Sequence, residues 1–453
     1  MLSQFFRRSL PLLALAALPM ACGEATTLTP IDEATELRDR WTVPVDGTIE
    51  QLFVEPGGGD VLVIHYAEFA YQISRFGADG SLRFQGLPFP ARFIDAAFTS
   101  AGTTVVLIQC DLPLSLGAVE LCSEAGPTHG LVEIDRAGVV VRVAPVPIAW
   151  TPVSNGGQIT SMALGPDGGV FVAGSTSFGE LRFDGVVVDD PGAGTEPFIA
   201  ELDPNLDAKR IQVLPIDNGW LTDLAVDGSS GDVVITGQFQ GTARLSGINL
   251  TSGAYERAIL YARLAPDGTA RWARHVAGAG AVSTYFDGDD VVLHGYGNPP
   301  YTSFDSVIPI DGPFVAHLDG RDGATESVWT TDSEVHEGDA AVADADWIAF
   351  LFTRQVETRA AYEPPVDCDY SVESCLPEPA EVEYRQILQV VDRDGEVLTE
   401  REVSTGEGTG VSLGHRLAIG SEGELYLARS IFKGAQNGDT TTSADLTKLV
   451  VAP

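Results

Sequence analysis

Two stretches near the middle of the chain repeat one pattern: residues 159–177 read ITSMALGPDGGVFVAGSTS, and residues 221–239 read LTDLAVDGSSGDVVITGQF. Each is followed by a second matching stretch, PFIAELDPNLDAKRIQVLP at 197–215 and AILYARLAPDGTARWARHV at 258–276. Within each stretch, runs rich in Val, Ile and Phe alternate with polar positions, and Gly, Pro and Asp separate the runs. This pattern is typical of β-strands joined by tight turns. One repeat therefore predicts a four-stranded antiparallel sheet of roughly 60 residues.

Further copies of both stretches extend through the chain. The first stretch occurs seven times, at 48–67, 94–109, 159–177, 221–239, 282–296, 339–353 and 411–429. The second follows six times, at 71–87, 130–147, 197–215, 258–276, 313–330 and 384–403. A sheet that is apolar on both faces cannot stand alone, so repeated sheets of this length predict stacking into a propeller.

The seventh copy is incomplete, because 445–453 (DLTKLVVAP) supplies a third strand before the sequence ends. At the other end, 40–45 (RWTVPV) aligns with 271–276 (RWARHV), the fourth strand of a complete copy. We therefore predict an all-β protein, a seven-bladed β-propeller over 40–453 with four-stranded antiparallel blades. The N-terminal strand closes the last blade and removes an open sheet edge.

The central copies resemble the bacterial cell-surface β-propeller repeat family, whose blades read F-V-A-x-L-D-x-x-G … W … V-T-x-x-A-V-D-x-x-G-x-V-x-V-T-G-x-F. The closest matches are 198–203 with 224–239, and 260–272. The resemblance covers most of 40–453, is close in the central copies and is faint in the first and sixth. It implies a seven-bladed propeller but no particular activity, because folds of this type support many functions.

The first 22 residues predict an export signal. Arg7 and Arg8 precede a short apolar core at 10–18, which is too short to span a membrane. Ala21 and Cys22 resemble the end of a bacterial lipoprotein signal, in which the cysteine becomes an acylated N-terminus. Pro19 departs from the usual Leu, so ordinary secretion is the alternative.

The polar residues 23–39 predict a flexible tether that holds the globular part away from a membrane. Gly23 follows the acylation candidate, where some bacteria place an Asp to retain lipoproteins at the inner membrane. By resemblance, we expect an exported lipoprotein of the outer membrane or cell surface that contacts lipid only through its N-terminus.

The formal net charge is −37. This charge disfavours nucleic acid and anionic lipid surfaces as partners, and it permits cationic or divalent-metal partners. The pattern Asp203-x-Asn205-x-Asp207 opens like a calcium loop, but Ala208 and Leu214 replace its glycine and its bidentate glutamate. The run at 287–290 likewise lacks further ligands. We predict strand turns at both places and no cofactor, and leave calcium open.

The sequence has five cysteines, of which Cys22 is the acylation candidate. Cys110 and Cys122 flank one loop between second and third strands, and Cys368 and Cys375 flank the corresponding loop of the sixth copy. An even remainder in an exported chain predicts two loop-closing disulfides. The alternative, a zinc ion bound by four thiolates, requires the second and sixth blades to meet.

Long insertions between second and third strands share one face of the predicted propeller, at 111–128, 178–196, 240–256, 298–311, 355–383 and 431–444. Because function often resides on loops presented by a rigid scaffold, we predict a binding face there. Aromatic side chains in or near these insertions could stack on sugar rings, or could pack the loops down: Tyr255, Tyr296, Tyr301, Phe304 and Tyr362. Trp41, Trp272 and Trp329 fall on outer strands and predict packing between blades.

Catalytic motifs are absent from the sequence. The seven histidines form no HExxH pair, and no GxSxG or GxxxxGK motif occurs. We therefore expect a monomeric, non-enzymatic surface lipoprotein whose propeller binds an envelope protein or a glycan. The alternatives are a polysaccharide lyase or glycosidase that uses carboxylates at the propeller mouth, and a structural envelope component without a specific ligand.

Overall fold

The computed structural model describes residues 36–452 apart from short gaps. The gaps are 69, 86–88, 90, 111–112, 117–118, 123–127, 151–156, 178–179, 190–193, 254–256, 279, 281, 298–302, 305–307, 310–311, 331–339, 344–346, 360–380, 407–412, 421–422 and 435–439. The described residues form β-strands and turns and contain no helix. Accordingly, no helix that could cross a membrane is found among them.

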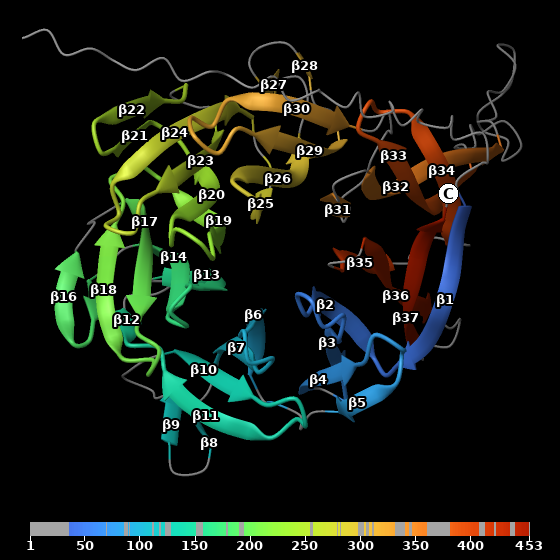
Figure 1. Ribbon diagram of the computed structural model, residues 1–453, viewed down its shortest axis with the longest axis horizontal. Helices are drawn as coiled ribbons and strands as arrows, with labels where there is room; N and C mark the ends of the chain where they lie inside the picture. The colour runs from blue at the N-terminus through green and yellow to red at the C-terminus, as the bar shows by residue number, and fades with distance from the viewer. Residues whose placement is uncertain are drawn as a thin grey trace, which may run out of the picture.

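Seven four-stranded antiparallel sheets account for most of the described chain, and Figure 1 shows them side by side around a common centre. In chain order, sheets 1 to 3 comprise β2 (Thr48–Val54), β3 (Val61–Ala67), β4 (Ala70–Phe76) and β5 (Leu82–Gln85); β6 (Arg92–Phe98), β7 (Thr104–Gln109), β10 (His129–Ile134) and β11 (Val140–Pro145); and β13 (Gly157–Leu164), β14 (Val170–Ser177), β17 (Thr195–Leu202) and β18 (Ala208–Val213).

Sheets 4 and 5 comprise β19 (Trp220–Val226), β20 (Val233–Phe239), β23 (Ala258–Leu264) and β24 (Ala270–Ala277); and β25 (Val282–Asp287), β26 (Asp290–Gly297), β29 (Gly312–Leu318) and β30 (Thr325–Thr330). Sheets 6 and 7 comprise β31 (Ala340–Ala343), β32 (Trp347–Arg359), β33 (Glu381–Asp392) and β34 (Val397–Gly406); and β35 (Leu413–Ile419), β36 (Glu424–Gly434), β37 (Thr440–Ala452) and β1 (Glu36–Val45). The first strand of each sheet lies innermost, as Figure 1 shows for β6, β13, β19 and β35.

The hydrophobic core lies between the sheets. The second strands are buried on both faces, and β20 is buried along its whole length. Separate apolar clusters connect neighbouring sheets; Leu224 and Leu260 of sheet 4, for example, belong to one cluster with Phe171 of sheet 3. Burial of apolar area on both faces of each sheet explains why one repeat needs its neighbours.

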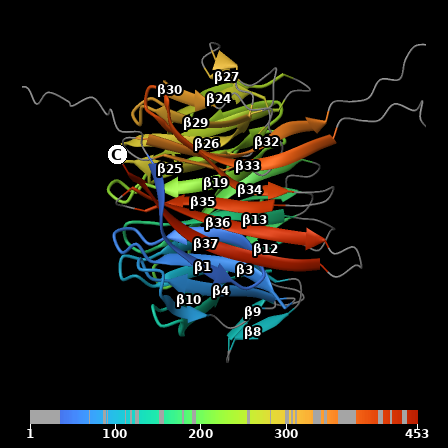
Figure 2. The same ribbon diagram turned by 90° about the vertical axis from the view of Figure 1, so that its right-hand side faces the viewer.

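The two ends of the described chain meet in sheet 7. Strand β1 pairs antiparallel with β37 from Glu36↔Ala452 to Val45↔Ala444, and the side view in Figure 2 shows the two strands alongside each other. Strand β1 begins at Glu36, four residues before the predicted start of the propeller. Ile49 of sheet 1 and Leu446 of sheet 7 share one buried cluster, so sheet 7 packs against sheet 1.

Tryptophan side chains on the outer strands donate hydrogen bonds to backbone carbonyl groups in turns of the next sheet. Nε1 of Trp41 donates to the carbonyl of Ala78 at 2.9 Å, and Nε1 of Trp272 donates to Gly320 at 2.9 Å. Trp329 makes the same contact with the carbonyl of Arg393 at 2.9 Å. The three tryptophans therefore lie between neighbouring sheets, where the sequence places them.

The long insertions are not simple loops. Four of them carry a small hairpin: β8 (Leu114–Leu116) with β9 (Val119–Cys122), β15 (Leu181–Phe183) with β16 (Val186–Asp189), β21 (Thr242–Leu245) with β22 (Ile248–Thr251), and β27 (Ser303–Phe304) with β28 (Ile308–Pro309). The hairpin of β15 and β16 gains a third strand, β12 (Ile148–Trp150), from the connection between sheets 2 and 3. Asp184 and Gly185 have φ of 51° and 76°, and Ser246 and Gly247 have φ of 47° and 88°. Positive φ at both central residues is the hairpin geometry that matches strand twist.

Candidate functional site

A polar depression of about 520 Å³ lies where the inner strands of sheets 2, 3 and 4 begin. This volume falls within the range of small-ligand pockets, roughly 300–1,000 Å³. The depression is on the side of the sheets from which the insertions after β7 and β14 depart, which is the predicted binding face. Its lining residues are Arg92, Gln109, Gly157, Gln158, Ser175, Ser177, Thr195 and Trp220.

Strand register explains why these side chains meet. Arg92 of β6 lies directly opposite Gln109 of β7, which lies opposite His129 of β10. In sheet 4, Trp220 of β19 lies opposite Gln238 of β20. Residues directly opposite each other on antiparallel strands place their side chains on the same face, so two rows of side chains border the depression.

Three buried polar atoms near the depression have no hydrogen-bond partner within the described part of the chain. They are Nε2 of His129, Nε1 of Trp150 and Oε1 of Gln238. Gly157 makes room for the indole of Trp150, because a Cβ built on Gly157 would lie 2.0 Å from that Nε1. Buried polar groups usually have a partner, but these three atoms are enclosed by protein and their residues are not among those that line the depression, so they assign no ligand to it.

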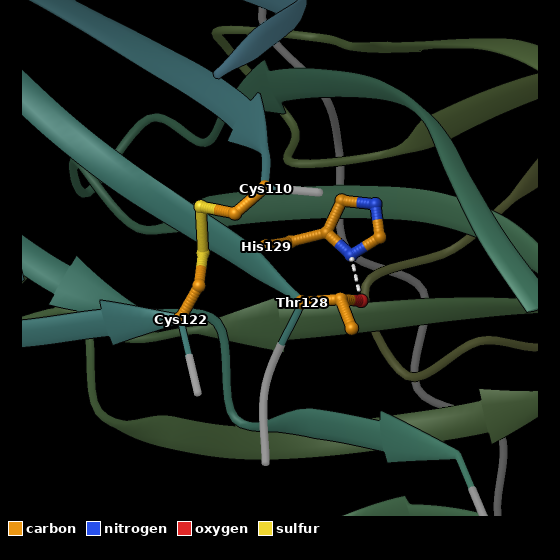
Figure 3. The surroundings of a disulfide bond; sticks show 4 residues. All are labelled: Cys110, Cys122, Thr128 and His129. Atoms are coloured by element: carbon orange, nitrogen blue, oxygen red, sulfur yellow. Dashed lines mark hydrogen bonds between the residues drawn. A yellow bond between two sulfur atoms is a disulfide. The ribbon is translucent and has the colours of Figure 1, made fainter. Parts of the chain in front are cut away.

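His129 is held beside the disulfide between Cys110 and Cys122, as Figure 3 shows. The backbone N–H of Cys110 donates to the carbonyl of Thr128 at 2.8 Å, and Nδ1 of His129 lies 3.0 Å from the hydroxyl of Thr128. Burial lowers the pKa of His129 to about 4. The imidazole is therefore neutral at physiological pH and can donate or accept a hydrogen bond.

Two carboxyl groups bridged by a serine lie further along the three inner strands that border the depression. Oγ of Ser161 on β13 lies 3.0 Å from Oδ2 of Asp95 on β6 and 2.6 Å from Oδ1 of Asp223 on β19. A β-bulge directly precedes each of these residues, since the register shifts between Phe93/Asp95, Ile159/Ser161 and Leu221/Asp223. Bulges re-aim side chains, and here they direct three polar groups toward one another.

Backbone N–H groups hold both carboxyls in place. Asp95 accepts from Met162 at 2.7 Å and from Ala96 at 2.8 Å. Asp223 accepts from Leu224 at 2.8 Å and from Thr284 at 2.9 Å. Sheets 2, 3, 4 and 5 are thus joined through two carboxyl groups, and the register of the strands that carry the depression depends on them.

Burial, followed by the charge of Asp223, raises the pKa of Asp95 to about 7. Burial also raises the pKa of Asp223. Both residues keep a small exposed area, while their carboxyl groups are enclosed by protein. A serine hydroxyl has one proton, so it can bridge two carboxyls only when one of them is protonated. The shorter contact runs from Ser161 to Asp223, and the raised pKa of Asp95 means that this carboxyl keeps its proton to a higher pH than a free aspartate does.

The described lining of the depression offers groups that can bind a polar ligand. Its lining offers one guanidinium, two amides, three hydroxyls and one indole. None of the eight lining residues is an acid, a histidine or a cysteine. Ser161 is only 2% exposed, so its hydroxyl is closed to substrate.

The cysteine and aromatic predictions have different outcomes. The structure joins Cys110 to Cys122, as the sequence predicts. Tyr296 lies in β26 and Phe304 in β27, but only their backbone is described. The other predicted site residues lie outside the described residues and stay predictions: Cys22, Tyr255, Tyr301, Tyr362, Cys368 and Cys375.

The calcium-like patterns form turns. Oδ1 of Asp203 accepts the backbone N–H groups of Asn205 at 2.8 Å and Asp207 at 3.0 Å, which closes the turn between β17 and β18. The run at 287–290 joins β25 to β26. Within the described ranges, no group of three or more His, Cys, Asp or Glu is placed to hold a metal ion.

The residues that line the depression were not nominated from the sequence. Arg92, Gly157 and Trp220 begin inner strands, and each is an isolated residue without a motif. Asp95, Ser161 and Asp223 did carry a signal, because they occupy equivalent positions in three aligned copies of the first stretch. Comparing that position across copies could have identified the carboxyl pair.

Comparison with known proteins finds distant structural similarity only. No family model matches the sequence, and no curated protein matches it. Among solved structures, the chain is similar to the Dos1 propeller (TM-score 0.39, 8% identity, 92% of this chain and 96% of that one). It is also similar to the polysaccharide lyase Uly1 (TM-score 0.43, 10% identity, 90% of each chain). A third similar structure is the quinohemoprotein alcohol dehydrogenase of Comamonas testosteroni (TM-score 0.41, 11% identity, 92% of this chain and 76% of that one).

The four-stranded antiparallel sheets grouped around a centre define an all-β protein of the propeller type. At identities of 8–11%, the similar structures carry no argument about activity. The function therefore has to be argued from the depression itself.

Proposed function

We propose that this chain is a non-enzymatic binding protein that recognises a glycan in the depression between sheets 2, 3 and 4. The observation that supports this proposal is the combination of a pocket-sized volume with a lining of amides, hydroxyls, a guanidinium and an indole. Gln109 and Gln158 can each donate and accept, which matches the hydroxyl groups of a sugar. The indole of Trp220 offers a flat apolar surface to the C–H face of a sugar ring.

The proposal includes the complete architecture. The seven four-stranded sheets are the blades of a seven-bladed propeller, and β1 closes the last blade by pairing with β37. The buried cluster shared by sheets 7 and 1 supports this closure. A closed ring keeps the inner strands in fixed positions, so the depression is preformed and loses little conformational freedom on binding.

The proposal also includes the location of the protein. Residues 1–22 direct export, Cys22 is acylated, and the part of 23–39 that precedes β1 tethers a monomeric propeller to the outer membrane or cell surface. Cys368 and Cys375 form a second disulfide. These statements rest on the sequence patterns alone. Metabolic labelling with a fatty-acid analogue tests the anchor, because Cys22→Ser is expected to abolish labelling of the exported chain.

A glycan array with the purified chain tests the binding proposal. We expect retention of one group of related oligosaccharides, with loss of at least tenfold in affinity for Trp220→Ala and for Gln158→Ala. Arg321→Ala serves as the matched control, because Arg321 is exposed in the turn between β29 and β30, outside the set of residues that line the depression. Binding that Trp220→Ala and Gln158→Ala leave intact would place the glycan elsewhere and refute the proposed site.

A polysaccharide lyase or glycosidase is the second candidate, and the pair of Asp95 and Asp223 is the observation that favours it. Two neighbouring carboxyls with raised pKa values are found in the active sites of enzymes that use general acid catalysis. Against it, backbone N–H groups occupy both carboxyls and Ser161 is buried. Release of reducing ends or unsaturated products that is lost in Asp95→Asn would favour the enzyme over the binding protein.

A further inference from the structure

Arg92 is the one charged residue among the side chains that line the depression. Within the described chain, none of the ion pairs joins it to a carboxylate. Other arginines are paired closely: Arg263 reaches Asp232 at 2.8 Å, and Arg429 reaches Asp445 at 2.7 Å. With 27 basic and 64 acidic residues in the sequence, acidic partners are abundant. Arg92 is exposed and lines the depression, and among the described residues it has no carboxylate partner, so its guanidinium is accessible to a ligand.

A second guanidinium lies beside the depression. The guanidinium carbon of Arg257 lies 4.9 Å from the centroid of the Trp220 ring, which lines the opposite side from Arg92. A cation over an aromatic face is attracted by the negative face of the ring. Arg257 is not among the lining residues, so Arg92 is the guanidinium that the depression itself presents, and Arg257 contributes positive charge next to Trp220.

We infer that the ligand carries a carboxylate, as in a uronic-acid residue of a polysaccharide, and that Arg92 binds it. This inference rests on the proposed glycan site. The planar fork of a guanidinium matches the two oxygens of a carboxylate, which permits two parallel hydrogen bonds. Gln109 lies directly opposite Arg92 across the β6–β7 pair, so its amide can bind a hydroxyl group of the same sugar residue.

The net charge of −37 opposes an anionic ligand at long range. Salt screens that repulsion beyond a Debye length of about 8 Å at physiological ionic strength, whereas a hydrogen-bonded guanidinium acts at about 3 Å. Contact with Arg92 therefore outweighs the overall field for a short oligosaccharide. A long polyanion meets more of the repulsive surface. We therefore expect the binding free energy per uronate residue to be more favourable for short uronate oligomers than for long ones.

Calorimetric titration of the purified full-length chain tests the inference with paired ligands. The ligands are trimers of galacturonate, mannuronate and glucuronate, each compared with the same trimer after chemical reduction of its carboxyl groups. We expect at least one uronate to bind about tenfold more tightly than its reduced counterpart. Arg92→Gln is expected to remove that difference, Arg92→Lys to retain part of it, and the exposed control Arg321→Gln to leave it unchanged.

The outcomes separate the two proposals. Equal affinity for reduced and unreduced trimers, with loss of both in Trp220→Ala, would overturn the carboxylate assignment and leave glycan binding in place. Tighter binding of a sulfated galactose trimer than of every uronate would also overturn it. Absence of binding across the panel, together with a blank glycan array, would refute the proposed function and this inference with it.

Discussion

Replacement of Asp95 by Asn is expected to change how the stability of the protein depends on pH. Burial and the neighbouring charge of Asp223 raise the pKa of Asp95 from 3.8 to about 7. The folded state therefore holds a proton that the unfolded state releases between these two pH values. The contribution of Asp95 to the free energy of unfolding is therefore greatest below pH 4, decreases as the pH rises toward 7, and is constant above pH 7.

The expected size of this fall follows from the two pKa values. At 1.36 kcal/mol for each pKa unit, the change from 3.8 to about 7 corresponds to about 4 kcal/mol, taken as an upper bound because Asp95 keeps some exposed area. Asp95→Asn cannot titrate. The free energy of unfolding of the wild type, minus that of the variant, should therefore decrease by up to about 4 kcal/mol between pH 4 and pH 8.

The variant also loses a hydrogen bond, because both oxygens of Asp95 accept backbone N–H groups and an amide offers one acceptor. That loss, about 1–3 kcal/mol, is independent of pH and does not affect the slope. Urea unfolding at pH 5, 6, 7 and 8 measures the difference, with Asp394→Asn as an exposed control. Parallel pH profiles for the wild type and Asp95→Asn would refute the shared proton.

Three further changes have expected outcomes. Cys110→Ser opens a disulfide of sequence separation 12 and should lower the free energy of unfolding by about 3 kcal/mol, measured in urea, with the difference vanishing under reductant. Gly237→Ala places a Cβ 2.2 Å from the carbonyl oxygen of Trp220 and should destabilise by about 2 kcal/mol; Gly228→Ala, with nothing within 4 Å, is the control, and equal midpoints for the two would contradict the packing argument. Trp41→Phe keeps an aromatic side chain but removes the indole N–H and its 2.9 Å bond to the neighbouring turn together with part of the ring, so thermal unfolding should show a loss of at least about 1 kcal/mol.

Much of the sheet framework was accessible from the sequence because period-two patterning and turn residues act locally. The match between 40–45 and 271–276 even predicted a strand at the N-terminus, which pairs with the last strand. The sequence does not predict the short strands within the insertions, because strands of two to four residues are too short to show alternation. The pairs Asp184-Gly185 and Ser246-Gly247 are the sequence signals for two of these hairpins, because Gly favours the positive φ that a two-residue hairpin turn requires.

The candidate site was less accessible for a physical reason. Arg92, Gln109 and Trp220 are far apart in sequence, and they converge only because three sheets pack at fixed positions. The aromatic residues chosen from the insertions, by contrast, were selected for their local setting, and the structure leaves their side chains undescribed. Local patterns thus predict strands, whereas a pocket between repeats depends on packing that no single repeat contains.

The pairing of β1 with β37 has a consequence for the order of events in biosynthesis. Strand β1 leaves the ribosome before the other strands of the seven sheets and must remain without its lasting neighbour until β37 has been made. The pairing of β1 with β37 is therefore among the last of the described strand pairings that folding can complete, and a permuted gene that encodes β1 directly after β37 would turn it into a simple local hairpin.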